Sequence, residues 1–101
     1  MIYKLESTLT SYSYSVYLAL EGNDISLSYD GNEKYKSSDL VDIGDSELDV
    51  FLRVNGMNGT DWSILILVTK PSDSTYKEEY KKSGEIESRG TIVLSEKFKL
   101  T

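Results

Sequence analysis

Apolar side chains alternate with polar ones along most of this chain, and this period of two constrains the fold more than any other feature. Successive side chains of a β-strand point to opposite faces, so the alternation gathers the apolar ones on one face. Sustained helical periodicity is scarce. The pattern predicts seven or eight short strands, at 2–7, 11–20, 25–29, 34–37, 48–54, 61–69 and 91–100, with 85–88 as the eighth.

Turn residues separate these strands about every 8 to 12 positions, a spacing typical of an antiparallel sandwich or a small barrel. Asp30-Gly31-Asn32 predicts a tight turn, because Gly and Asn tolerate a positive φ. The two Asn-Gly pairs of 55–59 predict a hairpin between 48–54 and 61–69, and Arg89-Gly90 predicts another between 85–88 and 91–100. We therefore expect one all-β domain over 1–101, an antiparallel β-sandwich or small barrel.

Two segments interrupt the strand pattern. Tyr76 and Tyr80 lie four residues apart, as do Lys77 and Lys81, and this spacing would pair them on the faces of a helix. We interpret the segment as a short helical turn near 74–82 or a wide polar loop, with a strand as the alternative. Segment 38–47 is acidic and indicates a turn around Gly44.

Two residue types that carry much of enzyme chemistry are missing, since the 101 residues include neither cysteine nor histidine. Their absence excludes disulfides, thiol nucleophiles, Cys/His zinc sites and imidazole acid–base catalysis. No phosphate-binding glycine loop or dinucleotide fingerprint occurs, and nothing distinguishes an acid–base pair among the seventeen acidic residues. We therefore expect neither enzymatic activity nor a cofactor.

Acidic residues are concentrated in the middle of the chain. Residues 21–49 hold nine acidic and two basic side chains, whereas the remaining residues hold eight acidic and nine basic ones. Three interpretations compete: a solvated loop, a docking surface for a basic protein, and a calcium site assembled from neighbouring loops. The spacing does not match an EF-hand loop, so no metal site is assigned. The candidate partner-binding residues are Asp39, Asp42, Asp45, Glu47 and Asp49.

Aromatic residues are the other candidates for recognition. Of the eight tyrosines, Tyr12 and Tyr14 share a predicted strand face with Val16, which favours packing over display. A recognition surface is the alternative, because tyrosine is common at interfaces. Trp62 is in phase with Ile64 and the apolar residues that follow, which predicts a core position rather than a sugar-stacking one.

The predicted function is a non-enzymatic protein-binding module, an inhibitor or antagonist of the anti-defence or immunity type that presents an acidic face to a basic partner. One alternative is a carbohydrate- or small-ligand-binding sandwich that uses exposed tyrosines and loop carboxylates, with or without calcium. A second alternative is a structural or virion subunit held by edge strands. The net charge of −6 and the lack of a basic patch argue against direct nucleic-acid binding. With no signal peptide and no apolar run of about 18 residues, we expect a cytoplasmic protein without a membrane segment.

Overall fold

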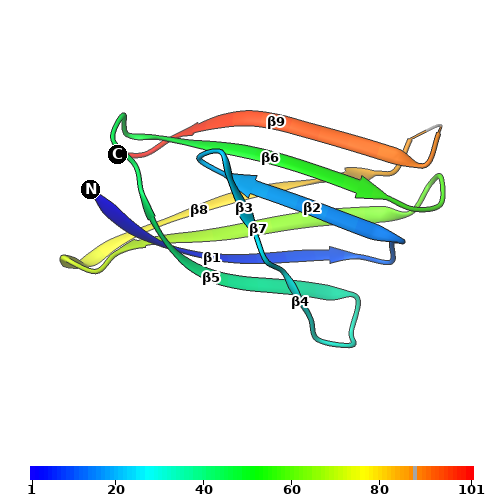
Figure 1. Ribbon diagram of the computed structural model, residues 1–101, viewed down its shortest axis with the longest axis horizontal. Helices are drawn as coiled ribbons and strands as arrows, with labels where there is room; N and C mark the ends of the chain where they lie inside the picture. Colours follow the sequence, from blue (N-terminus) through cyan, green and yellow to red (C-terminus); the bar gives the residue numbers. More distant parts are fainter. Residues whose placement is uncertain (88) are drawn as a thin grey trace.

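Two antiparallel β-sheets pack face to face (Figure 1). The structure is a computed structural model that describes residues 1–87 and 89–101. These residues form nine strands and no helix, so the described part of the chain contains no helix that could cross a membrane. The strands are β1 (Ile2–Ser11), β2 (Ser15–Leu20), β3 (Asn23–Ile25), β4 (Ser28–Tyr29), β5 (Lys34–Asp42), β6 (Glu47–Asn55), β7 (Asp61–Lys70), β8 (Asp73–Glu85) and β9 (Thr91–Lys99).

One sheet has five strands in the order β4-β5-β1-β7-β8, and the other has four in the order β3-β2-β6-β9. The core lies between their inner faces, where alternate residues of the long strands point. In β7, for example, Ile64, Ile66 and Val68 are at most 1% exposed. Burying each such side chain contributes about 1.5–3 kcal/mol to the free energy of folding. The predicted all-β antiparallel sandwich is confirmed, with nine strands in place of seven or eight.

The pairing of the strands differs from the predicted hairpins. β6 pairs with β2 and β9, whereas β7 pairs with β1 and β8, so β6 and β7 lie in different sheets. The chain also changes sheet between β8 and β9. The predicted hairpin between 48–54 and 61–69 is therefore wrong. The predicted hairpin between 85–88 and 91–100 is wrong for the described residues, because Glu85 ends β8 in the other sheet, while Ser88 lies outside the described residues. Gly56 lies in the 55–59 connection that crosses the sandwich. It is buried, and a Cβ there would lie 2.8 Å from Cδ1 of Ile86, so a larger residue would require that side chain to shift.

Residues 72–83 belong mainly to β8, and the expected helical turn near 74–82 is absent. Tyr76 and Tyr80 do share a face, but it is the inner face of the five-stranded sheet. Four is an even number, so this spacing puts two residues on one face of a strand as well as of a helix. Pairing along β7, from Asp61 opposite Glu85 to Thr69 opposite Lys77, outweighs the few tenths of a kcal/mol that helical side-chain pairs offer.

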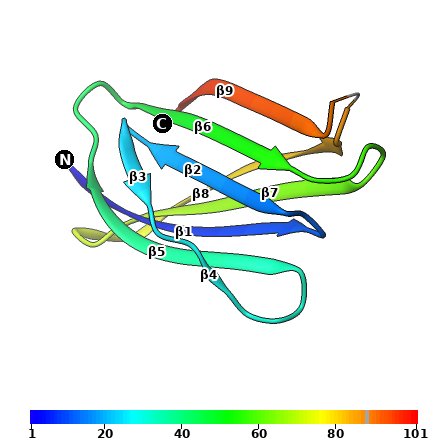
Figure 2. The same ribbon diagram turned by 45° about the vertical axis from the view of Figure 1, so that its right-hand side comes forward.

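Two further segments differ from the predicted pattern. β5 extends to Asp42, so only the end of segment 38–47 forms a turn, with Ser46 at φ 58°. The predicted strand 25–29 divides instead: β3 stays in the four-stranded sheet and β4 crosses to the five-stranded one (Figure 2). There β4 pairs with β5, which confirms the predicted pairing between this region and 34–37.

Tyr12 and Tyr14 lie in the connection between β1 and β2, where the chain passes from one sheet to the other. The predicted strand 11–20 therefore begins only at Ser15. Tyr12 is 66% exposed and Tyr14 is 74% exposed, so the prediction that they pack in the interior is wrong. The alternation of apolar and polar residues continues through this connection, but the backbone leaves the sheet there. Alternate side chains of the connection therefore no longer point into the core.

Candidate functional site

The structure does not gather the five predicted acidic residues on one face. Asp39 points inward from β5, opposite Leu5, and is half-buried. Asp42 lies on the outer face of the same strand, where its carboxylate is 2.7 Å from the N-terminal ammonium of Met1. These two carboxylates therefore face opposite sides of the five-stranded sheet, and one of them is neutralised.

The other three predicted residues lie together at one end of the four-stranded sheet, beside Glu21. The backbone N–H of Asp49 donates to the Glu21 carboxylate at 2.7 Å. Burial raises the pKa of Glu21, and the nearby carboxylates of Asp49 and Asp45 raise it further. Lys97 neutralises part of this cluster, because its ammonium is 3.4 Å from the Asp49 carboxylate. The expected acidic face is thus reduced to a mixed cluster of three of the five residues.

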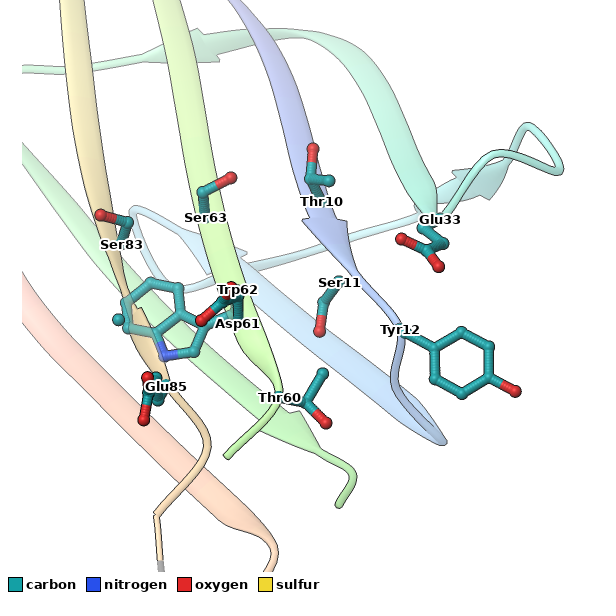
Figure 3. Close-up of a pocket in the computed structure, with 11 residues that line it drawn as sticks. Thr10, Ser11, Tyr12, Glu33, Thr60, Asp61, Trp62, Ser63, Ser83 and Glu85 are labelled. Atoms are coloured by element: carbon teal, nitrogen blue, oxygen red, sulfur yellow. The ribbon is translucent and has the colours of Figure 1, made fainter. Parts of the chain in front are cut away.

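A hollow of about 620 Å³, here called the end cleft, opens at the end of the five-stranded sheet where β1 and β8 finish and β7 begins (Figure 3). The register brings its residues together: Ser11 is opposite Trp62, and Trp62 is opposite Gly84. The turn before β5 adds Glu33. The lining consists of hydroxyls, carboxylates and two aromatic side chains: Thr10, Ser11, Tyr12, Glu33, Thr60, Asp61, Trp62, Ser63, Ser83, Gly84 and Glu85.

Trp62 is buried, as predicted, but it also lines the end cleft. The indole lies close against the backbone of β8, because Gly84 leaves room for it. A Cβ at Gly84 would lie 3.2 Å from the indole Nε1 and from Cζ2, tighter than ordinary contacts. The indole Nε1–H has no hydrogen-bond partner among the described residues. An indole normally finds a partner when it is buried, so this unpartnered donor singles out the end cleft as a candidate site.

Ser11, the last residue of β1, is a second buried polar group without a partner. It is 3% exposed, and its Oγ makes no hydrogen bond within 1–87 and 89–101. In Figure 3 its hydroxyl points into the space between β1 and the start of β7. An unsatisfied buried group costs about 1–3 kcal/mol, so two of them in one hollow are unfavourable for the fold alone.

Like charges and an unfavourable backbone conformation at the rim of the end cleft further destabilise the folded protein. Asp61 and Glu85 are directly opposite each other on β7 and β8, and like charges in that position destabilise a sheet. Glu33 adopts φ 60°, which is sparsely populated by residues other than glycine, and its carbonyl accepts a hydrogen bond from the Ser11 N–H at 2.9 Å. The ion pairs found in the described part of the chain do not include these three carboxylates. Such unrelieved strain is typical of functional sites.

Metal binding finds no support in this arrangement. Among residues 1–87 and 89–101, no three acidic side chains lie close enough together to hold a metal ion.

The sequence interpretation missed most of the end cleft. Ser11, Gly84 and Glu85 are unremarkable in the sequence and meet only because β1, β7 and β8 are neighbours in the sheet. One signal was available: a tryptophan at the start of an apolar strand, next to the acidic Asp61, marks a place where the core reaches the surface.

Comparisons with protein families, curated proteins and solved structures find no match to this chain. The chemistry of the end cleft must therefore be argued from its own donors, acceptors and shape.

Proposed function

We propose that this protein is a non-enzymatic module that binds a saccharide in the end cleft. The observation that carries the proposal is the pair of buried, unpartnered donors, Ser11 Oγ and Trp62 Nε1, on residues that line one hollow. A ligand that accepts hydrogen bonds from both would recover the free energy that the free protein loses there. Small-ligand sites commonly combine a concave shape with a few such placed polar groups.

The other lining groups suit a ligand whose hydroxyls both donate and accept. The carboxylates of Glu33, Asp61 and Glu85 accept hydrogen bonds, and a charged acceptor makes the stronger kind. Tyr12, 66% exposed at the rim, offers an apolar ring face for the C–H face of a sugar and a hydroxyl for its edge. In Figure 3 Tyr12 and Glu33 lie on the β1 side of the cleft, and Trp62 and Glu85 lie on the β8 side. A ligand between the two sides would be contacted from both.

Intrinsic fluorescence tests this proposal directly, because Trp62 is the only tryptophan in the chain. Titration with a panel of mono- and oligosaccharides should shift the emission of Trp62 in a saturable way for at least one sugar. Tyr12→Ser should weaken that binding, whereas Tyr14→Ser, at an exposed tyrosine outside the cleft lining, should not. Chromatography should recover the bound sugar intact after prolonged incubation. A panel that leaves the emission unchanged up to tens of millimolar contradicts saccharide binding, and cleavage of the sugar contradicts a purely binding role.

The second candidate is the protein-binding inhibitor or antagonist expected from the charge distribution. Its support is the convergence of Asp45, Glu47 and Asp49 beside Glu21. Reversal of the three to lysine should leave the circular dichroism spectrum unchanged and abolish binding of a lysine-rich peptide, measured by calorimetry. Asp42→Lys, on the other sheet, is the control. If the triple variant binds the peptide as tightly as the parent chain, the acidic cluster does not dock basic partners.

A further inference from the structure

A second hollow, of about 640 Å³, adjoins the end cleft on the outer face of the five-stranded sheet. Thr10, Ser63 and Ser83 line both hollows, so the hollows adjoin along the outer face, whereas Ser11 and Trp62 reach the end cleft from the inner face at the open end of the sheet. These three residues stand in one row across β1, β7 and β8, and Figure 3 shows their side chains on the same face. The second hollow, here called the lysine groove, is lined by Thr8, Thr10, Lys34, Ser63, Ile64, Leu65, Lys81, Lys82 and Ser83.

The lysine groove has the opposite charge to the end cleft. Lys34 rises from β5, opposite Thr10, and Lys81 rises from β8, opposite Leu65. β5 and β8 are the first and last of four neighbouring strands, so they lie about 14 Å apart at the usual strand spacing. No carboxylate is among the lining residues of the groove. Lys81 is 3.7 Å from Glu79 but keeps 69% of its side chain exposed, so this surface pair holds the cation loosely.

The two hollows together therefore form a polarised surface. The end cleft carries three carboxylates and no cation among its lining residues, whereas the groove carries Lys34 and Lys81. Its third lysine, Lys82, is 3.5 Å from the Glu96 carboxylate and is already paired. An anionic group on a ligand would be repelled from the cleft and attracted to the groove. A ligand that occupies both is consequently oriented by charge, with its neutral hydroxyls on Ser11 and Trp62 and its anionic groups over the lysines.

We infer that the ligand is an acidic oligosaccharide, a chain of sugar units bearing carboxylate or sulfate groups, that extends from the end cleft over the hydroxyl row onto Lys34 and Lys81. This inference rests on the proposed saccharide-binding function. It adds the charge of the saccharide and the direction in which the saccharide extends across the surface. The floor between the lysines consists of hydroxyls and the side chain of Leu65, with no aromatic ring on which a nucleobase could stack. The net charge of −6 also disfavours a long polyanion such as nucleic acid, which would meet repulsion beyond the groove.

A glycan array that carries neutral, carboxylated and sulfated oligosaccharides of matched length tests the inference. The acidic sugars should bind about tenfold more tightly than neutral ones at low salt, since each exposed charge pair contributes up to about 1 kcal/mol. Raising the salt to 0.5 M should remove most of that preference. The carboxylated and sulfated arms identify which anionic group the lysines accept. A single-stranded oligonucleotide is included as a further probe.

Variants separate the two proposals. Lys34→Gln with Lys81→Gln should abolish the preference for acidic sugars while leaving neutral-sugar affinity unchanged, and Lys99→Gln, on the other sheet, should change neither. Ser11→Ala should weaken both classes of sugar. Equal affinity for acidic and neutral sugars, or a preference that survives the double lysine variant, overturns the acidic-ligand inference and leaves saccharide binding standing. Failure of every sugar to bind overturns both, and oligonucleotide binding that acidic sugars do not displace overturns the inference in favour of nucleic acid.

Discussion

At the scale of single residues, the unpartnered hydroxyl of Ser11 should lower the stability of the fold and at the same time contribute to ligand binding. Ser7 provides a matched comparison, because it is also buried on the inner face of β1 and its Oγ has no partner in the described structure. Ser7 lies in the middle of the sheet, opposite Ser37 and Ile66, and does not line the end cleft. The two serines therefore carry the same folding cost in different places.

Ser11→Ala should raise the free energy of unfolding by about 1 kcal/mol, because it removes a buried polar atom that has no partner. The same change should weaken saccharide binding, since the ligand loses one donor. Ser7→Ala should give a similar gain in stability with no change in binding. Urea unfolding gives the first quantity and Trp62 fluorescence gives the second. If Ser11→Ala leaves affinity as it was, the hydroxyl has no part in the site.

Asp39 is a further residue whose position and charge conflict. Its Oδ2 is buried without a partner, next to the unpartnered hydroxyls of Ser7 and Ser37 on the inner face of the five-stranded sheet. Because one oxygen of this half-buried carboxylate is removed from water without a partner, replacement of the charged group by a neutral amide in Asp39→Asn should stabilise the protein by about 1 kcal/mol. Asp42→Asn, which removes the partner of the N-terminal ammonium, should not stabilise it. Thermal unfolding of the two variants compares them, and a loss of stability in Asp39→Asn contradicts the argument.

At the scale of secondary-structure elements, Gly84 in β8 controls where Trp62 lies. Gly84→Ala places a methyl group 3.2 Å from an indole that the core holds in place, so we expect a loss of about 1 kcal/mol and a shifted emission of Trp62. Gly44 is the control, because an added Cβ there meets nothing within 4 Å and its φ is not positive. Gly44→Ala should be neutral or slightly stabilising, through the unfolded chain. An unchanged emission in Gly84→Ala would mean that the indole is free to move.

The strands could be predicted from the sequence, but their partners could not. Alternation in β6 and β7 identifies both strands and their inner faces, because burial acts on every second residue whatever the neighbouring strand is. The glycine-rich connection between them is compatible with a hairpin and with a crossing to the other sheet, and the choice is made by the pairing of β6 and β7 with strands far away in the sequence. The end cleft depends on that choice, since β1 and β8 flank β7 only in the crossed arrangement. The local sequence pattern was therefore sufficient to predict the fold class but not the residues of the end cleft.

At the scale of the whole molecule, the two sheets are connected at one open side by a polar contact. The hydroxyl of Tyr80, on β8 of the five-stranded sheet, donates to the Glu96 carboxylate of β9 in the four-stranded sheet at 2.6 Å. Lys82 is 3.5 Å from the same carboxylate. Sequence alternation places Glu96 among inward-facing apolar residues of β9, which is an edge strand of its sheet. The register with β6 continues through Glu96 without a bulge, and the Tyr80 hydroxyl satisfies the carboxylate.

This contact makes the stability of the sandwich sensitive to alkaline pH. Burial raises the pKa of Tyr80, and the hydrogen bond to Glu96 raises it further. Burial likewise raises the pKa of Tyr76 to about 12. An unfolded tyrosine ionises near pH 10, so above that pH the unfolded chain loses protons that the folded chain retains. The stabilising contribution of both tyrosines is therefore complete below about pH 10 and is lost as the pH rises toward 12 and beyond.

We expect the urea midpoint to fall steeply between about pH 10 and pH 12, and Tyr80→Phe to make that fall shallower, because the variant has one fewer group to ionise on unfolding. Tyr14→Phe, at an exposed position, is the control and should leave the profile as it is in the parent chain. At pH 7 Tyr80→Phe should cost only about 1 kcal/mol, since Glu96 keeps Lys82 as a partner. An alkaline profile that is identical in Tyr80→Phe and the parent chain would show that this inter-sheet contact does not contribute to holding the edges together.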